Sequence, residues 1–140
     1  MLALLCVGGA GIAFVLYDKA TKPDRSAPEV VVRNYLQALL IDRSHVRAED
    51  YTCSEPGQLR EIENFAKDVV DRERVLGVSI IVSIERIVVH SENGSSASVG
   101  VSVRRSATVD GVPQSLVDSW NFDLRNEGGW RVCVALRIGE

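Results

Sequence analysis

The stretch SVGVSVRRSATVDGVPQSLVDSWNF (residues 98–122) decides the fold, because its apolar residues alternate on both sides of Asp110-Gly111. Alternation with a period of two is typical of a strand with one buried face, and Asp-Gly between two such runs indicates a two-residue hairpin turn. This turn sets Val103 opposite Asp118. The other pairs on that face are apolar: Val101 with Trp120, and Val99 with Phe122.

Two further turn signals, Asn93-Gly94 and Glu127-Gly128-Gly129, divide residues 78–138 into four strands, which we expect to form an antiparallel meander. A loop of three residues at 126–128 predicts the register of the last hairpin. The expected pairs are Leu124 with Trp130, Phe122 with Val132, and Trp120 with Val134.

The first strand changes its apolar face at Glu85-Arg86, which predicts a β-bulge there. The bulge would bring the apolar residues on both sides of it to the core and bend the strand. These residues are Ile80, Val82, Ile84, Ile87 and Val89.

Helical spacing of apolar residues precedes the strands. We expect one helix that Ser26 caps and that ends near Ile41, and a short helical turn within residues 42–52. A second amphipathic helix is expected to begin after Ser54 and to end near Leu76. The predicted class is therefore α+β, with two to three helices packed on a bent four-stranded antiparallel sheet.

Residues 1–17 carry no charged side chain and, as a helix, would span about 25 Å, the lower limit for a bilayer. The alternatives are weaker: no small-x-small site follows for a signal peptidase, and Leu5 before Cys6 does not suit lipidation. We expect a transmembrane anchor at 1–17, a linker at 18–27 and an extracytoplasmic domain at 28–140. The localisation expected is the cell membrane, with a single pass.

The composition argues against nucleic acid as a partner. The 140 residues carry a formal charge of −3, whereas phosphate binding requires an excess of clustered Lys and Arg.

Outside the apolar segment, the chain has two cysteines, Cys53 and Cys133, an even count that suits a disulfide in an oxidising compartment. Two unrelated buried thiols are the alternative. In the expected register Cys133 points away from the helices. A bond therefore requires the connection at 42–54 to wrap a sheet edge, or a bulge that turns Cys133 inward.

The run Tyr35-Leu36-Gln37-Ala38-Leu39, the later Cys53 and the strand Gly129-Trp130-Arg131-Val132-Cys133 resemble membrane-anchored proteins of actinobacteria with a nuclear transport factor 2-like (cystatin-like) domain. The resemblance covers about residues 27–138. It implies a cone of helices on a bent sheet, display outside the cytoplasm, a Cys53–Cys133 bond and accessory functions. Similar domains occur in Mce-associated membrane proteins and type IV secretion assembly factors, while soluble relatives include isomerases and dehydratases.

Asp118 is the inward polar residue that the register supports, with Arg105 diagonal to it on the neighbouring strand. We expect an ion pair, which would lower the carboxyl pKa and so move it in the wrong direction for a base near neutral pH. His45 and His90 lie where histidines are usually solvated. No Cys or His has metal-ligand spacing, so we assign no catalytic residue, metal or cofactor.

A group of inward residues either fills the core or lines a cavity in the cone: Phe65, Asp118, Trp120, Phe122 and Trp130. We favour a non-catalytic accessory or assembly domain that binds a protein partner at the cell envelope. The alternatives are a binder of a lipid or small apolar ligand in the cone, and an isomerase- or dehydratase-like enzyme.

Overall fold

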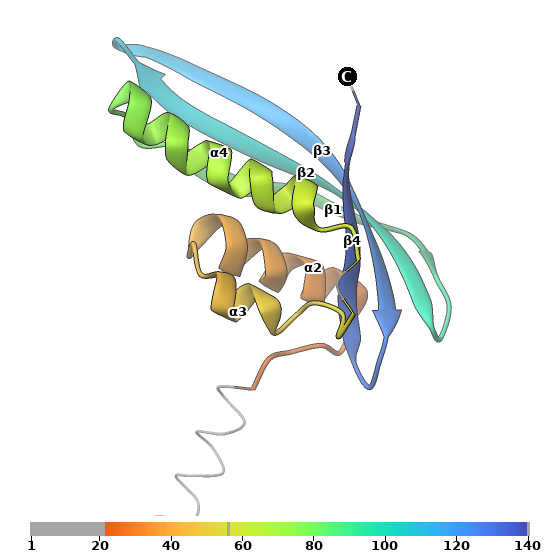
Figure 1. Cartoon of the computed structure of the whole chain (residues 1–140). Coiled ribbons are helices and arrows are strands. Elements are labelled where there is room, and N and C mark those ends of the chain that lie inside the picture. Colours follow the sequence, from red (N-terminus) through yellow and green to blue (C-terminus); the bar gives the residue numbers. More distant parts are fainter. Residues whose placement is uncertain (1–21, 56, 140) are drawn as a thin grey trace, which may run out of the picture.

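The structure, a computed structural model, describes residues 22–55 and 57–139. Helices lie on one face of a strongly bent antiparallel sheet whose strand order is β1-β2-β3-β4 (Figure 1). The elements are α2 (Pro28–Leu36), the π-helical turn η1 (Gln37–Ile41), α3 (His45–Glu49), α4 (Arg60–Leu76), β1 (Ile81–Glu92), β2 (Ser96–Val109), β3 (Val112–Asn126) and β4 (Trp130–Ile138). The predicted α+β class is confirmed.

The predicted anchor at 1–17 and the start of the predicted linker lie outside the described residues. Within the part that is described, no helix is both long and apolar enough to cross a bilayer.

The first helix ends where the apolar spacing predicts, but its cap differs. Ala27 is the N-cap and offers no side-chain hydrogen bond, and Pro28 occupies the first turn. Ser26 instead donates from its hydroxyl to Asp24, at 2.7 Å.

The long helix α4 begins at Arg60 rather than directly after Ser54, because the chain before it runs along the edge of β4. The Cys53 amide donates to the Val132 carbonyl at 2.9 Å, and the Ala135 amide donates to the Gln58 carbonyl at 3.0 Å. These bonds use backbone groups that a helix would need, and they cover one edge of the sheet.

The central hairpin has the predicted register. Val103 stands opposite Asp118, and Val101 opposite Trp120. The turn residues Asp110 and Gly111 both have positive φ, as a type I′ turn requires.

The last hairpin departs from prediction, because its loop is Glu127-Gly128-Gly129 and Asn126 pairs with Trp130. Both glycines have positive φ, at 69° and 132°, and the three-residue loop therefore lies one residue later in the chain than predicted. Leu124 therefore pairs with Val132 rather than with Trp130.

A bulge at Cys133 then shifts β4 once more. Beyond it Phe122 pairs with Ala135 and Trp120 with Arg137, so the predicted pairs with Val132 and Val134 are wrong. The bulge exchanges the two faces of β4, which brings Ala135 into the core.

The predicted bulge in β1 is present at Glu85, and a second irregularity follows Val89. Ile80, Ile84 and Ile87 pack against the core and Val82 belongs to it. Val89 is 36% exposed, because the end of β1 extends past the helices.

Candidate functional site

Asp118 forms the centre of a charged cluster on the helix-facing side of the sheet. Arg105 on β2 donates to both of its carboxylate oxygens, from Nε at 2.7 Å and from Nη2 at 3.1 Å. Arg137 on β4 donates from Nη2 to Oδ1 at 2.6 Å. The side chains of Arg105 and Asp118 are only 13% and 11% exposed. Both oxygens of the inward carboxylate are therefore occupied by guanidinium groups.

Aromatic rings pack against the two guanidinium groups. The centre of the Phe65 ring lies 4.9 Å from Cζ of Arg105 and 5.1 Å from Cζ of Arg137. Phe65 also meets Trp120 edge to face, with ring centroids 5.3 Å apart. Cation–π and aromatic contacts of this kind hold both arginines in place.

The charged cluster around Asp118 is suited to stabilising the fold rather than to transferring a proton. A carboxylate that accepts from two fixed guanidinium groups has no oxygen aimed at a substrate, whereas a general base must lie within hydrogen-bond reach of the proton it removes. The cluster carries one more positive than negative charge, with Arg137 the more exposed arginine at 41%.

Sequence reasoning missed Arg137. In the register expected for β4, Leu136 points toward the helices and Arg137 points away from them. The bulge at Cys133 reverses the directions of both side chains. Leu136 is consequently 42% exposed. A bulge next to a buried cysteine has no distinct signal in a single sequence.

The predicted cavity-lining aromatics are packed core. Phe65 is 6% exposed, Trp120 1%, Phe122 0% and Trp130 5%. Phe122 meets Tyr35 edge to face at 6.3 Å. Burial raises the pKa of Tyr35 well above its ordinary value, as expected for a phenol enclosed by apolar groups. The side chains thus fill the centre of the cone.

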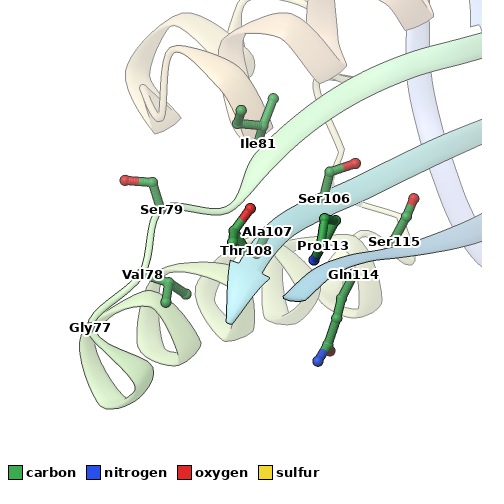
Figure 2. Close-up of a pocket in the computed structure, with 10 residues that line it drawn as sticks. All are labelled: Gly77, Val78, Ser79, Ile81, Ser106, Ala107, Thr108, Pro113, Gln114 and Ser115. Atoms are coloured by element: carbon green, nitrogen blue, oxygen red, sulfur yellow. The ribbon is translucent and has the colours of Figure 1, made fainter. Parts of the chain in front are cut away.

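Open space lies at one end of the cone, between the connection that follows α4 and the β2–β3 hairpin. A hollow of about 600 Å³ lies there. Figure 2 shows the residues that line it: Gly77, Val78, Ser79, Ile81, Ser106, Ala107, Thr108, Pro113, Gln114 and Ser115. None of these ten residues titrates near neutral pH.

An adjoining groove of about 380 Å³ is more apolar and includes Leu76, Ile80, Val109 and Leu116, with Arg72 and Arg105 at its sides. Neither space offers a general base.

The outer face of the sheet has a shallow hollow of about 320 Å³ over its central strands. Gly100 and the serines Ser102 and Ser119 line it, and Val88 and Ile138 stand among the residues around them. His90 reaches over Gly100, so closely that a Cβ atom on Gly100 would overlap the imidazole. We call this region the outer-face hollow.

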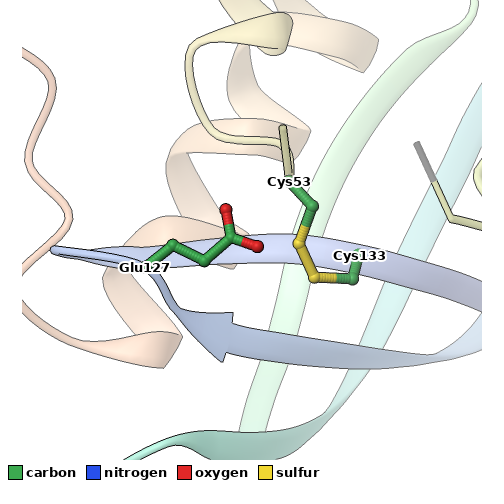
Figure 3. Close-up of side chains that lie close together, drawn as sticks. All are labelled: Cys53, Glu127 and Cys133. Carbon is green, nitrogen blue, oxygen red and sulfur yellow. A yellow bond between two sulfur atoms is a disulfide. The ribbon is translucent and has the colours of Figure 1, made fainter. Parts of the chain in front are cut away.

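Cys53 and Cys133 form a disulfide, with Cα atoms 5.1 Å apart. The sequence offered two alternatives for bringing these cysteines together, and the structure has both. The chain before α4 wraps the β4 edge, and the bulge turns Cys133 inward. Figure 3 shows the Glu127 carboxylate beside the bridge, and its ligand atom and the two sulfurs all lie within 4.8 Å of one another. Ser54 holds that carboxylate through its hydroxyl, at 3.1 Å. Because the sulfurs are bonded to each other, they are not free thiolate ligands.

No family model matches the sequence, and no curated protein matches it either. Solved structures do match in fold. A proposed aromatic ring hydroxylase from Novosphingobium aromaticivorans matches at 16% identity with a TM-score of 0.54, over 81% of this chain and 87% of that one. The protein Aln2 from a Streptomyces species matches at 13% identity with a TM-score of 0.55, over 79% of this chain and 90% of that one. The fold is therefore nuclear transport factor 2-like.

Proposed function

We propose that the chain is a non-catalytic accessory or assembly domain, anchored in the cell membrane through residues 1–17, which binds a protein partner outside the cytoplasm. The observation that carries the proposal is the filled centre of the cone: its aromatic side chains are buried, and arginines occupy its inward carboxylate. The two spaces at the end of the cone have no general base among their lining residues, which supports a function carried by the surface.

The outer-face hollow is the surface that suits a protein partner. Ser102 and Ser119 on the central strands leave room above the sheet beside His90, which covers Gly100, and the flanking Val88 and Ile138 are 36% and 50% exposed. A protruding apolar side chain of a partner would fit against these residues, and the hydroxyl groups would satisfy the polar atoms around it.

The anchored, extracytoplasmic placement is supported by the charge-free segment and by the disulfide. Protease added to intact spheroplasts should digest the domain, and the mature chain should retain residues 1–17. Protection of the domain in spheroplasts, or a mature chain that begins near residue 20, would contradict this part.

Site-specific crosslinking tests partner binding. A photoreactive residue in place of Ser102, in the hollow, should give one adduct in native membranes. The same residue in place of Ser95, in an exposed turn, should not. Ser119→Arg, which would fill the hollow, should abolish the Ser102 adduct while the melting temperature stays close to that of the wild type. Equal adducts at both positions would contradict the assignment.

The alternative is a small apolar ligand in the groove of about 380 Å³ beside Leu116 and Leu76. Ala107→Trp would fill the groove. If native mass spectrometry finds a lipid-sized ligand on the wild-type chain that Ala107→Trp removes, the ligand-binding function is the correct one.

A further inference from the structure

Strand β1 forms an open edge of the sheet. Among the described residues, no backbone hydrogen bond joins Ile81–Glu92 to any element except β2. The opposite edge, β4, is covered by residues 51–55 and 57–58, through the bonds of Cys53 and Gln58 described above. Unpaired amide and carbonyl groups on an edge strand are a template for another strand.

The bulge at Glu85 restricts which strand can pair there. Val82 and Ile84 face the helices before the bulge, and Ile87 faces them after it. The helix-facing residues are thus even-numbered before the bulge and odd-numbered after it. When two copies of β1 pair antiparallel, residues before the bulge of one copy lie opposite residues after the bulge of the other. Their helix-facing sides therefore coincide only if each even-numbered residue stands opposite an odd-numbered one.

One such register makes the strand complementary to itself. It sets Ile84 opposite Ile87 of a second copy, so that apolar residues meet on the helix side. It also sets Val82 opposite Val89. The same register places Glu85 opposite Arg86 of the second copy, and the two-fold axis repeats each of these contacts.

Both charged residues are available for this contact. Arg86 is exposed and has no ion pair in the described part of the chain. Arg104 and Ser83 both contact Oε1 of Glu85, at 2.8 and 3.3 Å. Oε2 of Glu85 is left without a partner among residues 22–55 and 57–139, and can accept from an arginine of another chain.

We propose that two copies of this chain associate by antiparallel pairing of their β1 edges, with Ile84 opposite Ile87 and Glu85 opposite Arg86 across a two-fold axis. The sheets of both copies then form one continuous sheet. Arg86 and Val88 lie both on this edge and in the outer-face hollow, so the two proposals are separated by Ser119→Arg, which should abolish the crosslink at Ser102 and leave dimerisation unchanged.

The test is sedimentation of the full-length chain over a range of concentrations. The wild type should dimerise reversibly. Arg86→Glu should weaken dimerisation about tenfold, because it sets Glu against Glu twice, and the exchange Glu85→Arg with Arg86→Glu should restore it. Arg125→Glu, an equal charge change on the exposed end of β3, is the matched control and should leave dimerisation unchanged. Circular dichroism must show every variant folded.

Hydrogen exchange supplies a second readout. Amides of residues 81–89 should gain protection as the wild type is concentrated, and Arg86→Glu should remove that gain. The proposal is overturned if the chain is monomeric throughout, or if it dimerises equally well with Arg86→Glu. A different protein found paired on β1 of a monomeric chain would overturn it too.

Discussion

Arg105 and Asp118 form a diagonal pair across β2 and β3, in which the arginine donates to both carboxylate oxygens although Asp118 stands directly opposite Val103. Diagonal neighbours on one face of an antiparallel pair lie within reach of a long side chain. The two-residue turn at Asp110-Gly111 fixes this geometry from the other end of the hairpin.

Asp118→Asn should reduce the free energy of unfolding by about 1 to 3 kcal/mol, because an amide cannot accept from Arg105 and Arg137 through two charged oxygens. Urea unfolding measures the change. Asp123→Asn, at an exposed position on the same strand, is the control and should have little effect. An Asp118→Asn chain with the wild-type melting temperature would show that the cluster does not stabilise the fold.

Gly57 lies against the backbone of β4, and a Cβ atom there would overlap the carbonyl oxygen of Cys133. Gly57→Ala should therefore destabilise the chain by about 2 kcal/mol or more, because backbone on both sides must move. At Gly94 a Cβ atom would meet nothing within 4 Å, so Gly94→Ala is the matched control. Equal unfolding midpoints for the two variants would mean that the chain around Gly57 does not pack on β4 as described.

Glu73 connects α4 to the loop after η1 and to the start of β1. It accepts from Arg43 at 2.7 and 2.8 Å and from the Ile80 amide at 2.7 Å. The Arg43 hydrogen bonds, followed by the Ile80 bond, lower the pKa of Glu73 below its ordinary value of 4.5.

A carboxyl group with a lowered pKa in the folded state stabilises the fold above its unfolded pKa, and this stability is lost as the pH falls through the folded pKa. Glu73→Gln should thus lower stability near neutral pH and flatten its decline below about pH 4.5. Unfolding midpoints from pH 2 to 7 test this, with Glu92→Gln at an exposed position as the control. An unchanged acid slope in Glu73→Gln would contradict the assignment.

The sequence predicts the structure well where turn chemistry and face matching act together, and poorly where tertiary contacts decide. Asp110-Gly111 allows one hairpin register, so Asp118 and Arg105 could be paired from the sequence. In the last hairpin, two adjacent glycines permit a three-residue loop at either of two positions, and the apolar faces match in both registers. The bulge at Cys133 depends on the chain that wraps the β4 edge, which no local pattern encodes. Arg137 was missed for that reason.

The Cys53–Cys133 bond closes a long loop, with a sequence separation of 80. Mass spectrometry of the non-reduced, alkylated chain should find neither cysteine modified. The chain-entropy relation gives at most about 4.5 kcal/mol for such a loop, so a reductant should lower the urea midpoint substantially. The double variant Cys53→Ser with Cys133→Ser should have the lower midpoint with or without reductant. A double variant as stable as the wild type would contradict a stabilising role.

Glu127 should slow the reduction of that bond. Its carboxylate lies within 4.8 Å of both sulfurs, where Ser54 holds it. Reduction requires an incoming thiolate and a departing one, and a neighbouring negative charge repels the first and disfavours the second.

Because Glu127 is exposed and therefore screened by salt, we expect Glu127→Gln to be reduced by glutathione only about two- to threefold faster, with a smaller difference at high ionic strength. Timed alkylation of the released thiols measures the rate, and Glu49→Gln, exposed at the end of α3, is the control. A rate increase in Glu127→Gln that salt does not diminish would indicate that the substitution opens the bridge to the reductant rather than removing a charge.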